Sequence, residues 1–371
     1  MAHALRLAHE GLYTTAPNPR VGCVVVRDAQ VVGAGFHRRA GEPHAETLAL
    51  AAAGASARGA TAYVTLEPCR HTGRTPPCTA ALIAAGVARV VAAMEDPDPR
   101  VAGQGLRELA AAGVATACGL AEQAARALNA GFVSRLSRHR PLVRIKLAMS
   151  LDGRTAMAGG ESRWITGPAA RRDVQHWRAQ SGAVVTGIGT VLADDPALDV
   201  RPEEMTPRAR RLAQPVRQPL RVVMDSRFRT PPGARLLHRG GEVLIAGSAP
   251  PDPLQARLRK HAELLVVEGA GKRPSPLALL EVLARREVND VLVEAGPALA
   301  GAFVREGLAD ELLIYAAPTL LGHGARPLLE LPNLTRMSQQ LRLEILDVAL
   351  VGRDLRLRLR PQAGAPAPMQ G

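Results

Sequence analysis

Three residues with the chemistry of metal ligands lie between positions 44 and 78, with one carboxylate beside them. His44 is followed two positions later by Glu46, and Cys69 is separated from Cys78 by eight residues. One imidazole and two thiolates suit zinc, and three protein ligands leave the fourth tetrahedral position to water. The pattern therefore predicts a catalytic zinc site with the ligands His44, Cys69 and Cys78.

Glu46 is the residue expected to move protons at this site. Zinc lowers the pKa of its bound water to about 7, so hydroxide forms at neutral pH. Deamination of an amidine-like ring carbon also needs a carboxylate that carries the water's proton to the ring nitrogen and then to the leaving ammonia. Glu46 can reach that water without being a ligand. An H-x-E motif followed by P-C and a second Cys is typical of zinc deaminases, although their usual C-x-x-C spacing is shorter.

A structural zinc closed by Cys23 is the alternative. Cys23 lies within VGCVVV, where a buried and inert thiol is the commoner outcome, and a structural site would give the Glu two residues after the His no task. We therefore favour the catalytic site. Cys118 also stands in apolar surroundings. His37, His139 and His176 lack such partners and are expected at the surface.

The loop between the two cysteines carries His71 and Arg74, which are or can become cationic. An arginine fork binds phosphate well, so a phosphorylated substrate would explain these residues, and a solvated loop is the alternative. Asn18 has an amide that can donate to and accept from a pyrimidine edge. Its alternative role is an Asx-turn before Pro19.

The elements that must position these residues alternate between helical and extended patterns, which is typical of an α/β domain. Residues 21–28 and 30–36 are expected to form a hairpin. The remaining expected elements of this part are the helices 2–11, 44–53, 79–85 and 103–112 and the strands 61–68 and 88–94.

A second α/β series begins after Pro141 and predicts another domain. It contains the expected helices 168–180, 276–286 and 297–306, the strands 142–150, 182–189, 219–226, 242–247, 263–269, 290–296 and 311–318, and a closing hairpin over 341–360. The basic, proline-containing segment 201–219 is expected to be a surface loop. We therefore predict domains at 1–140 and 141–361, with a disordered tail at 362–371.

The second domain offers one candidate phosphate site. VEAGPALAGAF (293–303) predicts a strand, a Gly-Pro turn and a helix, whose first backbone N–H groups could hold a phosphate. Plain chain reversal is the alternative. No G-x-G-x-x-G follows a strand here, so a Rossmann site is not indicated.

Composition and charge exclude several classes of protein. The 371 residues include 47 Lys and Arg against 34 Asp and Glu, but the basic residues are spread along the chain, which favours small anionic substrates over nucleic acid. Aromatic residues make up 2% of the chain and leave few platforms for stacking bases. No stretch approaches the roughly 20 apolar residues that cross a bilayer, and no secretory signal is evident. We expect a cytoplasmic protein without membrane or nucleic-acid partners.

Several longer motifs together resemble one family. PNPRVGCV, PHAE and TLEPCRHTGRTPPC in the first half are followed by LAMSLDGRTA, ESRWITGPAARRDVQ, GTVLADDPALDVR and VEAGPALAGAF in the second. In this order they resemble the bifunctional deaminase-reductase of riboflavin biosynthesis, over nearly the whole chain. Arg70 departs from the small polar residue that is usual in the family.

The resemblance implies a cytidine-deaminase-like α/β/α domain followed by a dihydrofolate-reductase-like α/β domain. It implies zinc-dependent deamination of 2,5-diamino-6-(5-phosphoribosylamino)pyrimidin-4(3H)-one and NADPH-dependent reduction of the ribosyl group, giving 5-amino-6-(5-phosphoribitylamino)uracil. The implied cofactor contacts are Ala148, Trp164, Thr190, Asp194, Ser226, Gly296, Pro297, Ala298, Leu299, Ala300, Gly301 and Ala302. The implied substrate contacts of the second domain are Ser162, Arg178, Leu198, Arg201 and Glu294.

Three roles in the reductase step remain open at this point. Arg178 and Arg201 could hold the substrate phosphate, and Glu294 could hold a sugar hydroxyl or the base edge. Arg227, next to Ser226 after an expected strand, is a candidate for the 2′-phosphate of NADPH. The acid of the reduction is not identified; Asp152 is a candidate by analogy, and a turn-stabilising role is its alternative.

Two competing functions share parts of these motifs. An RNA-editing zinc deaminase with a nucleic-acid-binding domain would use the positive charge, but the second half lacks aromatic platforms. A deaminase joined to a non-catalytic ligand-binding module would bind NADPH without turnover. We favour the bifunctional enzyme, and by analogy expect a homo-oligomer.

Overall fold

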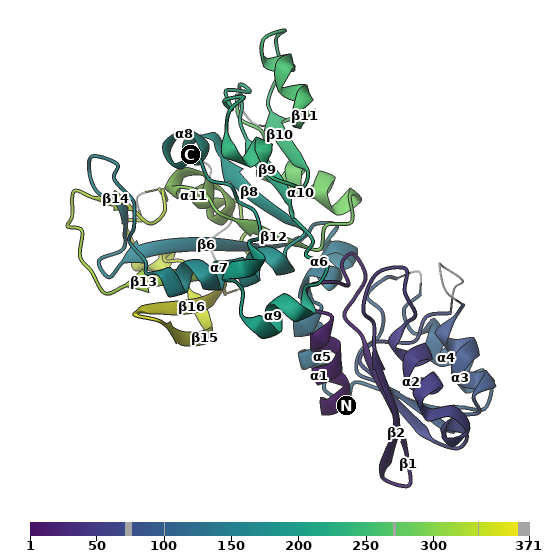
Figure 1. Cartoon of the computed structure of the whole chain (residues 1–371). Helices are drawn as coiled ribbons and strands as arrows, with labels where there is room; N and C mark the ends of the chain where they lie inside the picture. Colours follow the sequence, from purple (N-terminus) through teal and green to yellow (C-terminus); the bar gives the residue numbers. More distant parts are fainter. Residues whose placement is uncertain (71–75, 100, 270–271, 333, 363–371) are drawn as a thin grey trace. The chain divides into compact units, whose positions relative to one another are not determined.

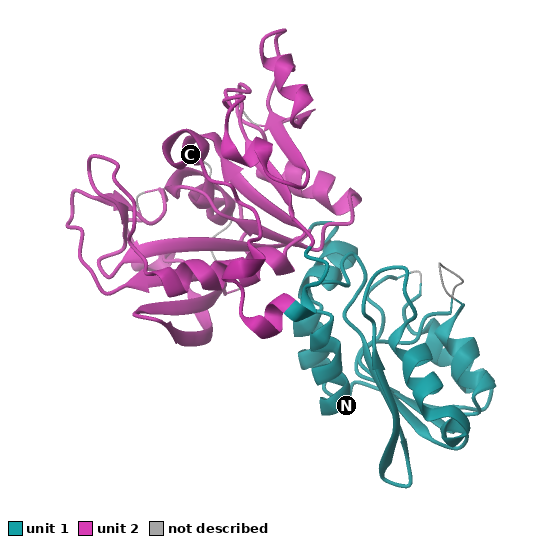
Figure 2. Cartoon of the chain, viewed as in Figure 1, with its two compact units in different colours: residues 1–140, 211–216 teal, residues 141–210, 217–371 magenta. Residues whose placement is uncertain are grey.

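The structure is a computed structural model that describes residues 1–70, 76–99, 101–269, 272–332 and 334–362. The chain forms two compact units (Figure 2): unit 1 comprises 1–140 and 211–216, and unit 2 comprises 141–210 and the chain from 217 onward. One border thus lies between residues 140 and 141. The short segment 211–216, which follows in the second half of the sequence, also groups with unit 1. Of the predicted tail, 362–371, all but residue 362 lies outside the described residues.

Unit 1 is built on a five-stranded sheet with the order β2-β1-β3-β4-β5. Strand β1 pairs antiparallel with β2 and β3, whereas β3, β4 and β5 run parallel (Figure 1). Its strands are β1 (Gly22–Arg27), β2 (Gln30–Phe36), β3 (Thr61–Val64), β4 (Arg89–Ala92) and β5 (Ala115–Cys118), and its helices are α1 (Ala2–Glu10), α2 (Ala45–Ala53), the short 3-10 helix η1 (Gly54–Ala57), α3 (Cys78–Ala84), α4 (Gln104–Ala111), α5 (Glu122–Leu128) and α6 (Ala130–Arg138).

Glycines in the β1–β2 hairpin let helices approach both faces of the sheet. A Cβ added at Gly33 would lie 2.2 Å from the Ala49 carbonyl oxygen of α2, and one added at Gly22 would lie 2.0 Å from the Ala4 carbonyl oxygen of α1. Gly33 pairs with Val25 in the ladder, so alternation along the strand puts Gly22 on the opposite face. Helices α1 and α2 therefore cover opposite faces, as an α/β/α arrangement requires.

Unit 2 is built on a nine-stranded sheet with the order β11-β10-β9-β8-β12-β6-β13-β16-β15, parallel from β11 to β13 and antiparallel at β16 and β15. Its strands are β6 (Leu142–Ser150), β8 (Ala183–Gly187), β9 (Leu220–Met224), β10 (Val243–Gly247), β11 (Glu263–Val266), β12 (Asp290–Val293), β13 (Glu311–Ala317), β15 (Leu343–Val351) and β16 (Asp354–Pro361), and β7 (Arg154–Ala156) pairs separately with β14 (Arg326–Pro327).

The helices of unit 2 cover both faces of this sheet. Leu312 and Ile314 of β13 join a core with Leu279 of α10 and Phe303 of α11, whereas Tyr315 joins a second core with α7. The helices are α7 (Pro168–Gln180), α8 (Ile188–Asp194), α9 (Pro207–Leu212), α10 (Pro276–Arg285) and α11 (Pro297–Arg305), and the 3-10 helices are η2 (Pro202–Glu204), η3 (Arg235–His238), η4 (Gln255–Lys260) and η5 (Met337–Gln339).

Most of the elements expected from the sequence are present, with three differences. Segment 201–219 is not a loop throughout but contains η2 and α9, both of which begin at a proline, a residue suited to the first helical position. Strand β3 ends at Val64 rather than at residue 68, since Pro68 has no N–H for a ladder. The elements that were not predicted are β5, α5, α6, β7, α8 and β14 and the 3-10 helices η1, η3, η4 and η5, and α8 includes the last two residues of the expected strand 182–189.

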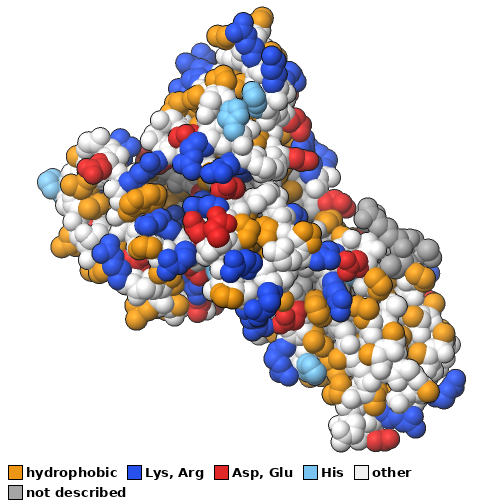
Figure 3. Space-filling model, viewed as in Figure 1, with side chains coloured by type: hydrophobic (Ala, Val, Ile, Leu, Met, Phe, Trp, Pro, Cys, Tyr) orange, Lys and Arg blue, Asp and Glu red, His pale blue; other side chains and the backbone are white. Residues whose placement is uncertain are grey.

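None of the described helices has both the length and the apolar character needed to cross a membrane. On the face of unit 2 seen in Figure 3, Lys and Arg side chains alternate with acidic ones rather than forming one continuous basic surface. This distribution agrees with the spread of charge along the sequence.

The close contact between β2 and α2 predicts that Gly33→Ala destabilises unit 1. The added methyl group would overlap the Ala49 carbonyl oxygen, so α2 would have to move away from the sheet. We expect a loss of about 1–3 kcal/mol in the free energy of unfolding, measured in urea. Val31→Ala on the same strand is the control, because Val31 is 53% exposed. Equal stability of the two variants would show that α2 is not held at this distance.

Candidate functional site

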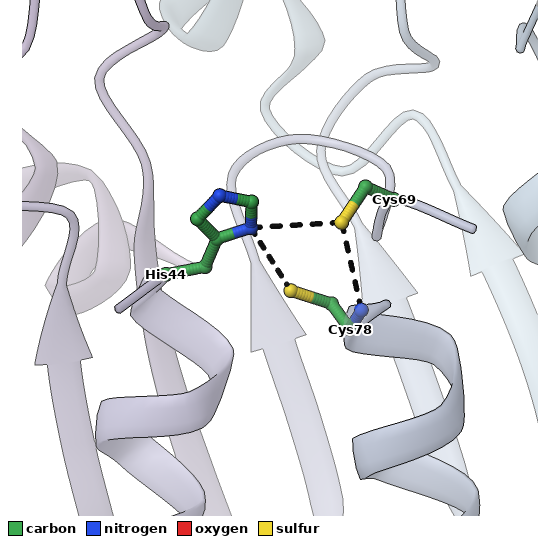
Figure 4. A group of neighbouring side chains, drawn as sticks. All are labelled: His44, Cys69 and Cys78. Carbon is green, nitrogen blue, oxygen red and sulfur yellow. Dashed lines mark hydrogen bonds between the residues drawn. The ribbon is translucent and has the colours of Figure 1, made fainter. Parts of the chain in front are cut away.

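The imidazole of His44 and the thiols of Cys69 and Cys78 converge in unit 1 (Figure 4). Their ligand atoms all lie within 4.8 Å of one another. His44 Nδ1 lies 3.2 Å from the Cys78 sulfur and 3.5 Å from the Cys69 sulfur. The three residues predicted to be zinc ligands are therefore brought together, with one nitrogen facing both sulfur atoms.

Two helix starts and one loop carry these side chains. His44 immediately precedes α2, Cys78 is the first residue of α3, and Cys69 lies in the loop after β3. The Cys69 carbonyl accepts a hydrogen bond from Thr79 N at 3.2 Å, and its sulfur accepts one from Cys78 N at 3.5 Å. These bonds hold the loop against the first turn of α3.

The protonation of the two thiols suits a metal cation. The pKa of Cys69 is lowered to about 4, chiefly because the Cys78 thiol donates a hydrogen bond to its sulfur and also because His44 lies beside it. The same hydrogen bond raises the pKa of Cys78, with burial adding to the rise. Cys69 is thus a thiolate ready to ligate, and a soft cation would displace the proton of Cys78. An imidazole with two thiolates fits zinc.

Glu46 lies in the first turn of α2 and is almost fully buried, with 4% of its surface exposed. Burial raises its pKa to about 7, and the neighbouring Cys69 thiolate adds to this rise. A cation held by the three ligands would oppose the rise. Glu46 is not a member of the ligand cluster found among the described residues, and its role in proton transfer stays a prediction.

His37 is the main correction to the predicted surroundings of the metal site. It was expected at the surface, but it is 3% exposed and its ring meets that of His44 edge to face at 5.3 Å. Its Nδ1 donates to the Pro43 carbonyl, so Nε2 accepts from the Asn18 amide at 3.0 Å. The Asn18 side chain therefore binds His37 instead of forming the alternative Asx-turn. Its interaction with a pyrimidine stays a prediction.

The burial expected for the other cysteines and histidines is confirmed for some of them and not for others. Cys23 is buried in β1 and does not belong to the described metal cluster, which leaves the structural alternative without its fourth ligand. Cys118 is exposed at the end of the outermost strand β5, contrary to the expected apolar surroundings. His139 is exposed as expected, and His176 is half-buried. The predicted substrate residues His71 and Arg74 lie outside the described residues.

Unit 2 contains a cavity of about 930 Å³. It gathers most of the residues that the family resemblance implied. The implied cofactor contacts that line it are Ala148, Trp164, Thr190, Asp194, Gly296, Pro297, Ala298 and Leu299, and the implied substrate contacts are Ser162, Arg178, Leu198, Arg201 and Glu294.

Four implied cofactor contacts do not line this cavity: Ser226, Ala300, Gly301 and Ala302. The positions of Ala300 and Gly301 on α11 explain why these two do not line the cavity. Ala300 is fully buried in the core, and Gly301 faces the Glu330 carbonyl, where an added Cβ would lie 2.3 Å away. The start of α11, rather than its whole first half, therefore borders the cavity.

An ion pair inside the cavity changes the role expected of Arg178. Its Nε and Nη2 donate to the two carboxylate oxygens of Glu294 at 2.6 and 3.0 Å, and its Nη1 donates to the Asp199 carbonyl at 3.0 Å. Burial alone would raise the pKa of Glu294, but the Arg178 guanidinium, helped by the charges of Lys146 and Arg201, holds that pKa below its usual value. Arg178 is therefore engaged in fixing Glu294.

Three other cavity residues, Arg201, Trp164 and Gly296, each contact one neighbouring side chain. Arg201 pairs with Glu204 at 2.6 Å but keeps 40% of its side chain exposed, so it is the more accessible of the two predicted phosphate-binding arginines. The Trp164 ring is 67% exposed, with the Arg171 guanidinium 4.4 Å from its centre. Gly296 N donates to Thr190 Oγ1 at 3.3 Å.

Comparisons with known proteins match both halves of the chain. Residues 1–94 match the cytidine and deoxycytidylate deaminase zinc-binding region, and residues 141–357 match the RibD C-terminal domain. The riboflavin biosynthesis protein RibD of Escherichia coli is 50% identical over 97% of this chain and 98% of its own length.

The chain belongs to the RibD family.

Two solved structures support this assignment along the whole chain. RibD of Acinetobacter baumannii is 49% identical, with a TM-score of 0.88 and 97% of both chains covered. A diaminohydroxyphosphoribosylaminopyrimidine deaminase/5-amino-6-(5-phosphoribosylamino)uracil reductase from Thermotoga maritima is 31% identical, with a TM-score of 0.83, and covers 98% of this chain and 97% of its own. The prediction of an α/β deaminase-like domain followed by an α/β reductase domain is confirmed, as is the bifunctional deaminase-reductase of riboflavin biosynthesis.

Lys146 is a cavity residue of this RibD-family chain that sequence reasoning missed. It lies on β6 and lines the cavity, and burial lowers its pKa while the nearby Glu294 charge opposes that change. It was missed because it stands inside an apolar strand pattern; a charged residue within a buried strand was the available clue. Asp152, the candidate acid, instead accepts hydrogen bonds from Ser150 Oγ at 2.5 Å and Gly322 N at 2.7 Å, and does not line the cavity.

The position of Lys146 predicts that Lys146→Met impairs the reductase and spares the deaminase. A half-buried ammonium at a cavity wall is suited to an oxygen of the bound substrate, and a charge-assisted hydrogen bond contributes about 1.5–3 kcal/mol. We expect the reductase kcat/KM to fall roughly ten- to a hundredfold, measured by formation of the reduced product from deaminated substrate. Lys260→Met on η4, outside the cavity lining, is the matched control. An unchanged kcat/KM would remove Lys146 from the site.

Proposed function

We propose that unit 1 deaminates 2,5-diamino-6-(5-phosphoribosylamino)pyrimidin-4(3H)-one and that unit 2 then reduces the ribosyl group with NADPH. The product is 5-amino-6-(5-phosphoribitylamino)uracil. The single observation that carries the first step is the convergence of His44, Cys69 and Cys78 next to the non-ligating carboxylate of Glu46. The second step is supported by the cavity in unit 2 and by the activities named for the Thermotoga maritima relative.

In the deaminase step, His44 Nδ1 and the two cysteine sulfurs would hold zinc, which when bound supplies the Lewis acidity that makes water nucleophilic at neutral pH. Glu46 takes the proton that water loses and delivers it to the ring nitrogen. The carboxylate then takes the second proton, from the hydroxyl now bonded to the ring carbon, and passes it to the amino nitrogen. The C–N bond breaks, ammonia leaves, and the C–O bond becomes the carbonyl of the product. Burial suits Glu46 to this exchange because it raises the pKa of the carboxyl group, which makes the protonated form between the two transfers easier to reach.

In the reductase step, NADPH when bound would supply a hydride for C1 of the ribosyl group, whose bond to the ring oxygen breaks as that oxygen gains a proton. Arg201 has the exposure to bind the substrate phosphate. Glu294, fixed by Arg178, can accept a hydrogen bond from a sugar hydroxyl or the base edge. The start of α11 offers backbone N–H groups to the cofactor's pyrophosphate. Assembly into a homo-oligomer and a cytoplasmic location remain predictions.

The deaminase proposal predicts that Glu46→Gln loses deamination while retaining zinc. Glutamine keeps the shape of the side chain but cannot carry a proton, so the rate should fall by at least about 10²-fold. Zinc content by elemental analysis should stay stoichiometric, and reduction of deaminated substrate should be unchanged. Cys69→Ser serves as the comparison, since it should lose both metal and deamination. Loss of zinc from Glu46→Gln would instead make Glu46 a ligand.

The reductase proposal predicts a preference for NADPH over NADH that depends on Arg227. Arg227 is exposed just after β9, although neither it nor Ser226 lines the cavity. If its guanidinium binds the 2′-phosphate, Arg227→Ala should weaken NADPH binding roughly ten- to a hundredfold and leave NADH binding unchanged in titrations by fluorescence. Arg229→Ala, two residues along and 3.8 Å from Asp225, is the matched control. Equal weakening for both cofactors, or none, would exclude this role.

A further inference from the structure

A carboxylate that the proposed chemistry does not use is buried beside the metal ligands. Glu67 is 5% exposed, and its two oxygens accept four backbone hydrogen bonds. Oε2 accepts from Asp96 N at 3.1 Å and from Gly103 N at 2.8 Å, and Oε1 accepts from Gly105 N at 2.7 Å and from Leu106 N at 3.2 Å. Each oxygen thus has two donors, which a carboxylate satisfies and a neutral side chain does not.

The four donors belong to residues 96–99 and 101–106, called the segment 96–106 below, which leads into the first turn of α4. This segment approaches the chain around Glu67 closely: a Cβ added at Gly105 would lie 2.1 Å from the Pro68 carbonyl oxygen. Gly103 has a φ of 70°, a conformation that favours glycine. The segment is therefore shaped to wrap around one buried carboxylate.

Further contacts join the same helix to both sides of the loop that carries the thiol ligands. Arg70, next to Cys69, lies 3.5 Å from a Glu108 oxygen of α4, and Thr79, next to Cys78, donates to Glu108 at 3.2 Å. Arg70 also contacts Gln104. These contacts are more exposed and individually weaker than the four bonds of Glu67. Glu67 is the buried member of the group, two residues before Cys69.

We propose that Glu67 is a positioning residue of the metal site, whose buried carboxylate fixes the segment 96–106 and α4 against the loop and thereby holds Cys69 at ligating distance from His44 and Cys78. The inference rests on the proposed metal site but not on the identity of the substrate. Glu67→Gln would replace one oxygen by an NH₂ group facing two N–H donors, so that half of the arrangement becomes repulsive.

The first experiment measures amide hydrogen exchange in the metal-free full-length chain. In Glu67→Gln, the amides of Gly103, Gly105 and Leu106 should exchange at least about tenfold faster than in the unaltered chain. The second measures zinc affinity by chelator competition, where the loss should be about 10- to 100-fold. Deaminase activity should recover toward the original value as free zinc is raised, and reductase activity should not change.

Leu109→Ala is the matched control for a merely structural role. Leu109 is fully buried on α4, so its truncation should destabilise the same helix without touching the bonds of Glu67. We expect Leu109→Ala to lower thermal stability while leaving zinc affinity within about threefold. Glu67→Asp keeps the charge on a shorter side chain and should give a zinc affinity between those of the unaltered chain and Glu67→Gln. If Glu67→Gln does not fold, the Asp variant provides the test.

Two results would overturn the proposal. One is an unaltered zinc affinity in folded Glu67→Gln or Glu67→Asp. The other is an equal loss of zinc affinity in Leu109→Ala at the same loss of stability, because the effect would then come from the stability of α4 alone. Failure of the proposed deamination would appear differently, as a chain that binds zinc tightly in a Glu67-dependent way but does not release ammonia from the substrate.

Discussion

Holding an imidazole and two sulfur atoms within 4.8 Å of one another is the constraint on which unit 1 depends. The imidazole nitrogen and the two sulfur atoms carry partial charges of the same sign, and the sulfur atoms are bulky. Such groups stay close together only where the backbone fixes them or a cation attracts them. The backbone contributes directly here: His44 and Cys78 stand at the starts of α2 and α3, and Cys69 is bonded to α3 through its carbonyl and its sulfur. Backbone contacts of this kind reduce the conformational entropy that ligand side chains lose when a metal binds.

The same physical rule governs the charged groups in both units, since a buried charge is tolerated only where partners replace water. Glu67 obtains four backbone donors, and Glu294 obtains both arms of the Arg178 guanidinium. Burial raises the pKa of Glu46, whereas the pKa of Glu294 is held below its usual value. The carboxylate proposed to carry a proton is thus the one whose pKa is raised, which agrees with the tendency of perturbed pKa values to occur at reactive positions.

The cavity of unit 2 shows how a family motif and its geometry can diverge in detail. The start of α11 borders the cavity, but Ala300 and Gly301 turn toward the core and the Glu330 carbonyl. Arg178 lines the cavity, but its guanidinium donates hydrogen bonds to the Glu294 carboxylate and the Asp199 carbonyl. Lys146 lies on a mostly apolar strand and lines the cavity. The sequence motifs thus predicted which residues lie at the cavity, and the side-chain contacts show which of them face the cavity and which bind other protein groups.

The sequence by itself determined most of the elements and the predicted ligand set, because these follow from local patterns. The extended apolar runs of β1 and β2, the Ala-rich run of α2 and the His, Glu and Cys spacing are all visible without coordinates. Only the tertiary structure decided which side chains meet: that His37 is buried against His44 and Asn18, that Cys23 stays outside the metal cluster, and that Glu67 binds a segment some thirty residues further along. Such contacts depend on long-range packing, and a single sequence records the residue types but not their partners.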